Sequence, residues 1–280
     1  MPAKKSKKPI TDKFKLKENL QGKNKFVAFI DVMGFSNLVY KSSGSAEALD
    51  SYFSKITDEI DDIRSSTLGD KLQSFLISDS IILIAPEGLD GLRLVINTVR
   101  RIQSALLWRK ILLRGAISFG EVFYDPKHNI IVGKAFIKAY KLEHEANYPR
   151  VIIDPSIIKK VGSDKTAFLK AVNGSLEYNF EHREIYVPSG FSKIAEDGIF
   201  VDYATKTVRE KDLNENIKRV YEVIVENLYI EQSLFQKYVW LRDYFTESLK
   251  YTSSFIPEMA GPHSPYKKIL KDWTEKFERL

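Results

Sequence analysis

The feature that most constrains the fold is an apolar strand that runs directly into an acid. Residues 26–30, Phe-Val-Ala-Phe-Ile, are strand formers followed at once by Asp31, and Gly34 then interrupts the strand before a predicted helix. A charge at the end of a buried strand costs free energy unless a cation meets it. The chain must therefore bury this strand while giving the Asp31 carboxylate a positively charged partner.

A second acid interrupts a second apolar stretch. Residues 72–85 predict two strands joined by a tight turn, with Asp79 at the bend between Ser78 and Ser80. Two carboxylates at strand ends suit Mg²⁺ or Mn²⁺, because hard cations take oxygen ligands and share them with phosphates. The alternative is that Asp31 and Asp79 are unrelated, one capping a helix and the other serving a turn, where aspartate is common.

Helical and strand-like periodicities alternate after the first strand. Apolar residues at helical spacing predict an amphipathic helix over residues 46–65, ahead of the hairpin. The elements expected after the hairpin are a helix from Gly88 to about Trp108, strands over 111–124 and 130–132, a helix from Gly133 to near Asn147, and a strand over 151–153. This order favours an α+β sandwich with a mostly antiparallel sheet covered by helices.

The remainder of the chain predicts additions to that core. Residues 155–205 alternate short helical and strand-like pieces, and residues 214–251 carry one long helical pattern. We expect Pro257, Pro262 and Pro265 to break that pattern before a final helix. The predicted organisation is a basic flexible arm over 1–25, a catalytic domain over 26–205 and a helical C-terminal extension over 206–280.

Composition and charge exclude several classes of protein. A chain of 280 residues that is 44% hydrophobic can bury a core, and the absence of cysteine excludes disulfides and thiolate sites. No apolar run approaches the ~20 residues that span a bilayer, and the lysine-rich start lacks the apolar region of a secretory signal. A cytoplasmic protein without a transmembrane segment is therefore expected.

The positive charge is concentrated at the start of the chain. Residues 1–25 hold nine lysines against two acids, a charge of +7, so the rest of a chain with net charge +6 is nearly neutral. Such an arm can contact nucleic acid or an anionic membrane surface, or it can be a solvated tail. No aromatic platform or groove motif accompanies the lysines, so no DNA binding is expected.

The two acidic motifs resemble those of the class III nucleotidyl cyclases, the adenylate and guanylate cyclase family. That family begins with Phe-x-Asp-Ile-x-Gly-Phe-Ser/Thr, which residues 29–36 match except for Val32. The family's second acid follows a strand in a Gly-Asp turn, and Ser78-Asp79 stands there in this chain. The resemblance implies a ferredoxin-like core with a metal-binding aspartate on each of two adjacent strand ends.

Two later motifs extend the resemblance through residue 153. Arg114, Ile117 and Gly120 resemble the family's Arg-x-Gly-Ile-x-x-Gly strand, with Ala116 in place of its first glycine. Residues 133–142 resemble the following Gly-x-x-Val-Asn-x-Ala-x-Arg helix. In that helix the asparagine position is Ile137 and the arginine position is Lys141.

The exact residues of the motifs are similar to those of the pyrimidine cyclases of bacterial Pycsar anti-phage systems. The shared segments are Ser-Asp-Ser, Arg-Gly-Ala-Ile with Gly-Glu, and Ala-Tyr-x-Leu-Glu. Those enzymes make cyclic UMP or cyclic CMP on infection, and the product activates a separate effector protein. The positions with which purine cyclases read the base fall near Phe75 and Ile130, which cannot make those hydrogen bonds. UTP is the expected substrate, and CTP remains an alternative.

The resemblance also implies a metal site and a phosphate site. Asp31, Asp79 and the Val32 carbonyl would hold two Mn²⁺ or Mg²⁺ ions. The backbone amides of Met33, Gly34, Phe35 and Ser36, at a helix N-terminus, are expected to form a phosphate cradle.

Three further side chains are candidates, each with an ordinary structural alternative. Lys141 is expected to meet charge on the α-phosphate across a homodimer interface, or else to be a solvated helix lysine. Arg114 is a candidate catalytic residue, or else faces solvent or pairs with Glu121. Phe75 is a candidate for stacking on the pyrimidine, or else belongs to the core.

Two other functions fit parts of the pattern. The replacements at Ile137 and Lys141 allow a cyclase-homology module that binds nucleotide without turnover. A cyclic dinucleotide synthase or polymerase palm shares paired acids on a related sheet, but the Gly-Phe-Ser loop does not support it.

Overall fold

The computed structural model describes residues 23–35, 46–65, 71–109, 111–126, 128–173, 185–186, 199–204, 212–260 and 265–280. The expectations for the basic arm up to residue 22 and for the Ser36 amide lie outside these residues. The strands are β1 (Asn24–Val32), β2 (Gln73–Ile77), β3 (Ser80–Pro86), β4 (Leu113–Glu121), β5 (Phe123–Asp125), β6 (Ile130–Val132), β7 (Val151–Ile153), β8 (Ile185–Tyr186) and β9 (Phe200–Val201). The helices are α3 (Ala46–Arg64), α4 (Leu89–Leu107), α5 (Lys134–Glu145), α6 (Pro155–Val161), α7 (Lys165–Asn173), α9 (Leu213–Asn227), α10 (Gln232–Ala260) and α11 (Pro265–Glu278).

The main sheet has the strand order β2-β3-β1-β4-β7-β9-β8, with β1 in its interior. Strand β1 pairs antiparallel with both β3 and β4, and β2 pairs antiparallel with β3. Strand β7 joins β4 in parallel. The unit β1-α3-β2-β3-α4-β4 with this order is a ferredoxin-like β-α-β-β-α-β arrangement. The predicted α+β class, with a mostly antiparallel sheet covered by helices, is confirmed.

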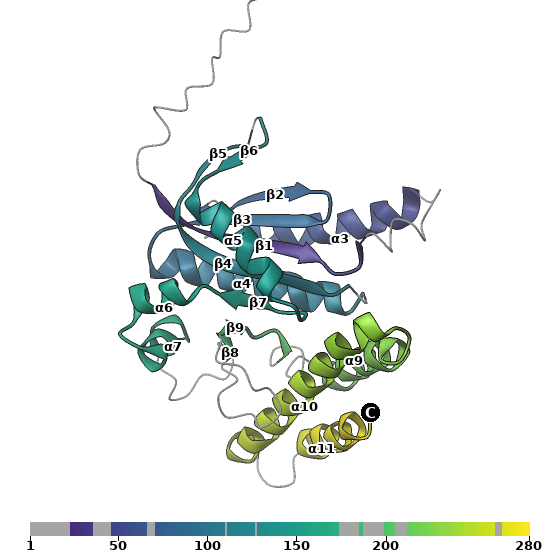
Figure 1. The fold of residues 1–280 in the computed structure, drawn as a ribbon. Coiled ribbons are helices and arrows are strands. Elements are labelled where there is room, and N and C mark those ends of the chain that lie inside the picture. Colours follow the sequence, from purple (N-terminus) through teal and green to yellow (C-terminus); the bar gives the residue numbers. More distant parts are fainter. Residues whose placement is uncertain are drawn as a thin grey trace, which may run out of the picture.

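The two faces of the sheet bury alternate residues of β1. Phe26, Ala28 and Ile30 belong to a core shared with α3 and α4, whereas Val27 and Phe29 belong to a smaller core beneath α5. Period-two alternation produces this division, because successive side chains of a strand point to opposite faces. Figure 1 shows α5 on one side of the sheet and α3 and α4 on the other. Asp31 continues the register of Val27 and Phe29, so it lies on the α5 side.

Most predicted elements lie where the periodicity placed them, but the strand expected over 111–124 is interrupted. Strand β4 ends at Glu121 and β5 begins at Phe123, and β5 pairs with β6 in a separate hairpin. Gly120 has φ +153, and a Cβ on Gly133 would lie 2.4 Å from the Glu121 carbonyl oxygen. The strand therefore bends where the start of α5 packs closely against its backbone.

The long helical pattern predicted over 214–251 is two helices. Helix α9 ends at Asn227, and the chain turns before α10 begins at Gln232, because apolar faces of both helices are buried in one core. The break expected around the three prolines is confirmed, since α10 ends at Ala260 and the final helix begins at Pro265, although Pro257 itself lies within α10. Pro257 lies in the last turn of α10, where a lost backbone hydrogen bond affects little of the helix.

The C-terminal helices share a core with one end of the sheet. Tyr244 of α10 is fully buried, and its hydroxyl donates to Asp202 Oδ1 at 2.7 Å and accepts from the backbone amides of Tyr203 and Ala204, each at 3.0 Å. Phe200 of β9 packs in the same core. One phenol thus ties α10 to the segment that follows β9.

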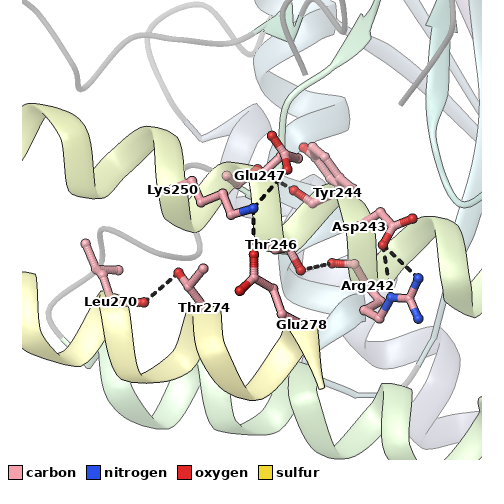
Figure 2. A network of polar contacts seen from close by, with 10 residues as sticks. Arg242, Asp243, Tyr244, Thr246, Glu247, Lys250, Leu270, Thr274 and Glu278 are labelled. Carbon is pink, nitrogen blue, oxygen red and sulfur yellow. Dashed lines mark hydrogen bonds and ion pairs between the residues drawn. The ribbon is translucent and has the colours of Figure 1, made fainter. Parts of the chain in front are cut away.

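Polar contacts also join α10 to α11 (Figure 2). Lys250 of α10 lies 2.7 Å from Glu278 of α11 and 3.5 Å from Glu247 of its own helix. Among the helices in the described ranges, none combines the length and apolar character needed to cross a bilayer.

Candidate functional site

Strand pairing brings the two acids of the sequence motifs to adjoining strand ends. Asp31 is opposite Ser80 across the β1–β3 ladder, and Asp79 precedes Ser80 in the two-residue turn between β2 and β3. The Val32 amide donates to the Asp79 carbonyl oxygen at 3.2 Å, which fixes the turn against the end of β1. Ser78 takes up the left-handed conformation that such a turn requires, with φ 55.

Arg114 supplies the cation that the buried end of β1 requires. It is opposite Asp31 across the β1–β4 ladder, and its Nη2 and Nε atoms lie 3.3 and 3.4 Å from Asp31 Oδ2. The same Nε lies 2.5 Å from Oε1 of Glu143, which α5 places over the sheet with a side chain only 2% exposed. The alternative pairing of Arg114 with Glu121 is wrong, because Glu121 points away to Lys134 at 3.3 Å.

The site holds more negative than positive charge. Burial, followed by the nearby carboxylates of Glu143 and Asp79, raises the pKa of Asp31 to about 6, although Arg114 acts to lower it. Among the described residues, Arg114 pairs with Asp31 and Glu143, and the Asp79 carboxylate acts on Asp31 as well. A divalent cation would relieve the repulsion that remains.

A tyrosine hydroxyl is buried beside the same acids. Tyr52 of α3 is 3% exposed, and its pKa is raised by burial, by Asp79 and by Asp31. Within the described part of the chain its hydroxyl has no hydrogen-bond partner. A buried hydroxyl is costly to leave unsatisfied, so its place near two acids favours a bound polar ligand there.

The loop after β1 only partly matches the expected phosphate cradle. The Met33 amide donates to the Leu112 carbonyl oxygen at 2.9 Å, so it is occupied within the chain and that part of the expectation is wrong. Gly34 has φ +78 with open space around its Cα, and the Phe35 ring packs on Tyr52 at a centroid distance of 5.5 Å. Among the residues described, the amides of Gly34 and Phe35 remain candidates for such a cradle.

The other candidate residues lie away from Asp31. Phe75 is 6% exposed and packs edge-on against Tyr124 at 6.3 Å, in the core beneath α5. Lys141 is exposed on α5, on the same outward face as Ile137, which is 50% exposed. Within one chain, Lys141 therefore does not join the acids.

The donors at Asp31 suit a metal shared with a phosphate better than a closed protein site. Nowhere in the described ranges do three or more His, Cys, Asp or Glu side chains gather so that they could hold a metal. Asp31, Asp79 and the Val32 carbonyl are oxygen donors, and Mg²⁺ is commonly held by one or two carboxylates together with waters and substrate phosphates. The residues present fit such an ion.

Two members of this site had no role in the sequence prediction. Glu143 follows Ala135 and Ala139 at helical spacing, so a carboxylate in an otherwise apolar stripe was the available signal. Tyr52 belongs to the apolar face of α3, where nothing in the sequence separates a ligand-binding phenol from a core aromatic.

Comparison with known proteins gives distant likenesses only. No family model matches the sequence, and no curated protein matches it. A bacterial light-regulated adenylyl cyclase aligns with 50% of this chain and 45% of its own, at 16% identity and a TM-score of 0.37. A class III adenylyl cyclase-like ATP-binding protein from Pseudomonas aeruginosa aligns with 54% of this chain and 40% of its own, at 10% identity and a TM-score of 0.37. The chain thus spans less than half the length of either structure, and likenesses this distant do not bear on function.

Proposed function

We propose that this chain is a nucleotidyl cyclase that converts UTP into 3′,5′-cyclic UMP and pyrophosphate. The observation that carries the proposal is the placement of Asp31 and Asp79 at adjoining strand ends, in a cluster with more negative than positive charge. A divalent cation that brings a triphosphate would complete both the charge and the oxygen ligands of this cluster.

The proposed cofactors are two Mn²⁺ or Mg²⁺ ions held by Asp31, Asp79 and the Val32 carbonyl. When bound, such ions activate the ribose 3′-hydroxyl and stabilise the departing pyrophosphate. The ionised Asp31 carboxylate is the ligand form, and Arg114 beside it offsets part of its charge. The amides of Gly34 and Phe35 would bind phosphate oxygens, and the Tyr52 hydroxyl is a further donor.

A pyrimidine substrate is supported by the apolar side chains at the base-reading positions. Phe75 is buried, Ile130 is half-buried, and neither carries a polar atom for a purine edge. These side chains do not separate UTP from CTP, so a cytidylate cyclase is the alternative within this proposal. By the resemblance of its motifs, the cyclic nucleotide would activate a separate effector in anti-phage defence.

A homodimer belongs to the proposal, because Lys141 can reach a set of acids only on a second chain. The exposed large apolar residues on the α5 side of the sheet support such an interface, namely Ile77, Val132, Ile137 and Tyr140. Lys141 of one protomer would then meet charge developing on the α-phosphate bound by the other.

The test is product formation by the purified protein with each ribonucleoside triphosphate in turn and Mn²⁺. We expect cyclic UMP and pyrophosphate from UTP, and loss of at least 100-fold in rate for Asp79→Ala. Asp272→Ala removes an exposed aspartate of α11 and is the matched control. Absence of a cyclic product with every nucleotide would refute the enzyme, whereas product from ATP alone would refute the pyrimidine assignment.

One observation favours a second candidate, a nucleotide-binding module without turnover. Arg114 already occupies the Asp31 carboxylate at 3.3 Å, and Ile137 and Lys141 replace the residues expected on α5. Nucleotide binding that depends on Asp79 but yields no product would support this module over the enzyme.

A further inference from the structure

A cavity lies at the opposite end of β1 from Asp31. Its volume is about 600 Å³, and it is lined by Lys23 and Lys25 at the start of β1 and by residues 122–126 around β5. Asp31 follows Lys25 by six positions, which is about 20 Å along a strand. Figure 1 shows the β5–β6 hairpin projecting at this end of the sheet. The cavity is therefore distinct from the proposed catalytic site.

Two lysines on one side of the cavity hold positive charge close together. Lys23 directly precedes β1 and Lys25 is its second residue, and both side chains line the cavity. The Lys25 ammonium lies 5.6 Å from the centroid of the Tyr124 ring. Burial and the charge of Lys23 both lower the pKa of Lys25. A bound anion would offset the repulsion between the Lys23 and Lys25 ammonium groups.

The acids near these lysines have partners of their own. Asp125 lines the cavity, and its Oδ2 atom lies 2.7 Å from His128 Nδ1 within the hairpin. Glu121, at the end of β4, pairs with Lys134 at 3.3 Å. The described lining therefore keeps an excess of positive charge.

The other walls are apolar or aromatic. Val122 and Phe123 are buried beneath the cavity, and Tyr124 and Pro126 present flat surfaces. A volume of several hundred cubic ångströms with a few convergent polar groups is typical of small-molecule sites. Lysines bind phosphate as point charges, and an aromatic ring can contact a nucleobase or sugar.

We infer that this cavity is a second binding site whose ligand is a small nucleoside phosphate or polyphosphate. Lys23 and Lys25 bind the phosphate groups, and Tyr124 with Pro126 contacts the less polar part of the molecule. The site requires no metal and does not depend on the proposed cyclase activity.

The inference is tested by calorimetric titration of the full-length protein with UMP and with inorganic triphosphate in EDTA, which removes any metal-dependent site. We expect Lys25→Met to weaken binding of both at least tenfold, because the variant keeps the apolar stem but loses the charge. Lys160→Met is the matched control, since Lys160 lies 4.4 Å over the Phe119 ring but pairs with Glu87 at 2.9 Å. Near-UV circular dichroism checks that each variant is folded.

The proposal predicts that Asp79→Ala binds both probes in EDTA as the unaltered protein does. Equal weakening by Lys160→Met, loss of binding in Asp79→Ala, or no binding of either probe at millimolar concentration would overturn the second site. Tighter binding of a single-stranded oligonucleotide that displaces UMP would overturn the small-molecule assignment. Because no step uses turnover, failure here leaves the cyclase proposal unaffected.

Discussion

Removal of the Arg114 guanidinium should show how strongly the buried carboxylate of Glu143 depends on it. The two side chains approach to 2.5 Å, and the Glu143 side chain is 2% exposed whereas that of Arg114 is 26% exposed. Arg114→Met keeps most of the packing volume but leaves Glu143 and Asp31 without their shared cation. Glu143→Gln keeps the shape of the other partner and removes its charge.

The size of the effect follows from burial. Removing one partner of a fully buried ion pair costs about 3–5 kcal/mol. Water reaches part of Arg114, so we expect Arg114→Met to lower the free energy of unfolding by about 2–3 kcal/mol. Glu143→Gln should cost about 1 kcal/mol, because the neutral amide leaves no buried charge and Arg114 keeps Asp31 as its partner. The double variant should cost less than the two together by about 1–2 kcal/mol, because Arg114→Met no longer leaves a buried charge at Glu143.

The assay is urea unfolding at pH 7.5, followed by far-UV circular dichroism at two protein concentrations so that any association is detected. Lys134 and Glu121 provide a matched control cycle, since their ion pair is 85% and 54% exposed. That cycle should give a coupling below about 0.5 kcal/mol. Additive effects of Arg114→Met and Glu143→Gln, within about 0.3 kcal/mol, would refute the coupling between these two buried groups.

Four individual groups give further predictions. The folded-state pKa of Asp31, about 6, exceeds its ordinary 3.8, so this group's contribution to apoprotein stability is fully present below pH 3.8 and is lost as pH rises through 6. Mn²⁺ affinity at this site should rise in the same range, approaching tenfold per pH unit below pH 6, and equal affinities by calorimetry at pH 5 and 7 would contradict it. Tyr52→Phe should change the free energy of unfolding by less than about 1 kcal/mol yet slow cyclase turnover about tenfold, and turnover equal to that of the unaltered protein would exclude a role for the hydroxyl. Tyr244→Phe should cost about 2–4 kcal/mol in urea unfolding, because the Asp202 carboxylate and two backbone amides lose their shared partner. Gly115→Ala should cost more than about 3 kcal/mol or prevent folding, since its Cβ would lie 2.4 Å from the Phe29 carbonyl oxygen, and a protein of undiminished melting temperature would show that β4 can shift.

The fold was accessible from sequence wherever local periodicity decides the structure. The alternation through Phe29 and Asp31 and the two-residue turn at Ser78-Asp79 depend on near neighbours in the chain, and both strand ends lie where they were predicted. Helix α3 likewise follows its apolar spacing. That the second acid lies on the neighbouring strand end was implied by the family resemblance and not by local periodicity.

The contacts that sequence could not predict depend on register between distant segments. Glu143 contacts Arg114 only because α5 crosses β4 at the position of Arg114. The Met33 amide is hydrogen-bonded only because the Leu112 carbonyl lies beside it. The chain reversal after Asn227 depends on burial of two helix faces together, which a single long apolar pattern does not reveal. Local sequence patterns do not specify contacts between residues that are far apart in the chain.

The core beneath the C-terminal helices has a consequence for the loop that follows Asp31. Met33 packs against this core, and Leu112, whose carbonyl oxygen holds the Met33 amide, is one of its buried members. Helices α9 to α11 therefore support the backbone that follows Asp31. A protein shortened to its first 204 residues would keep every described strand of the sheet and both aspartates. It would lose the helices whose core packs against Met33 and Leu112.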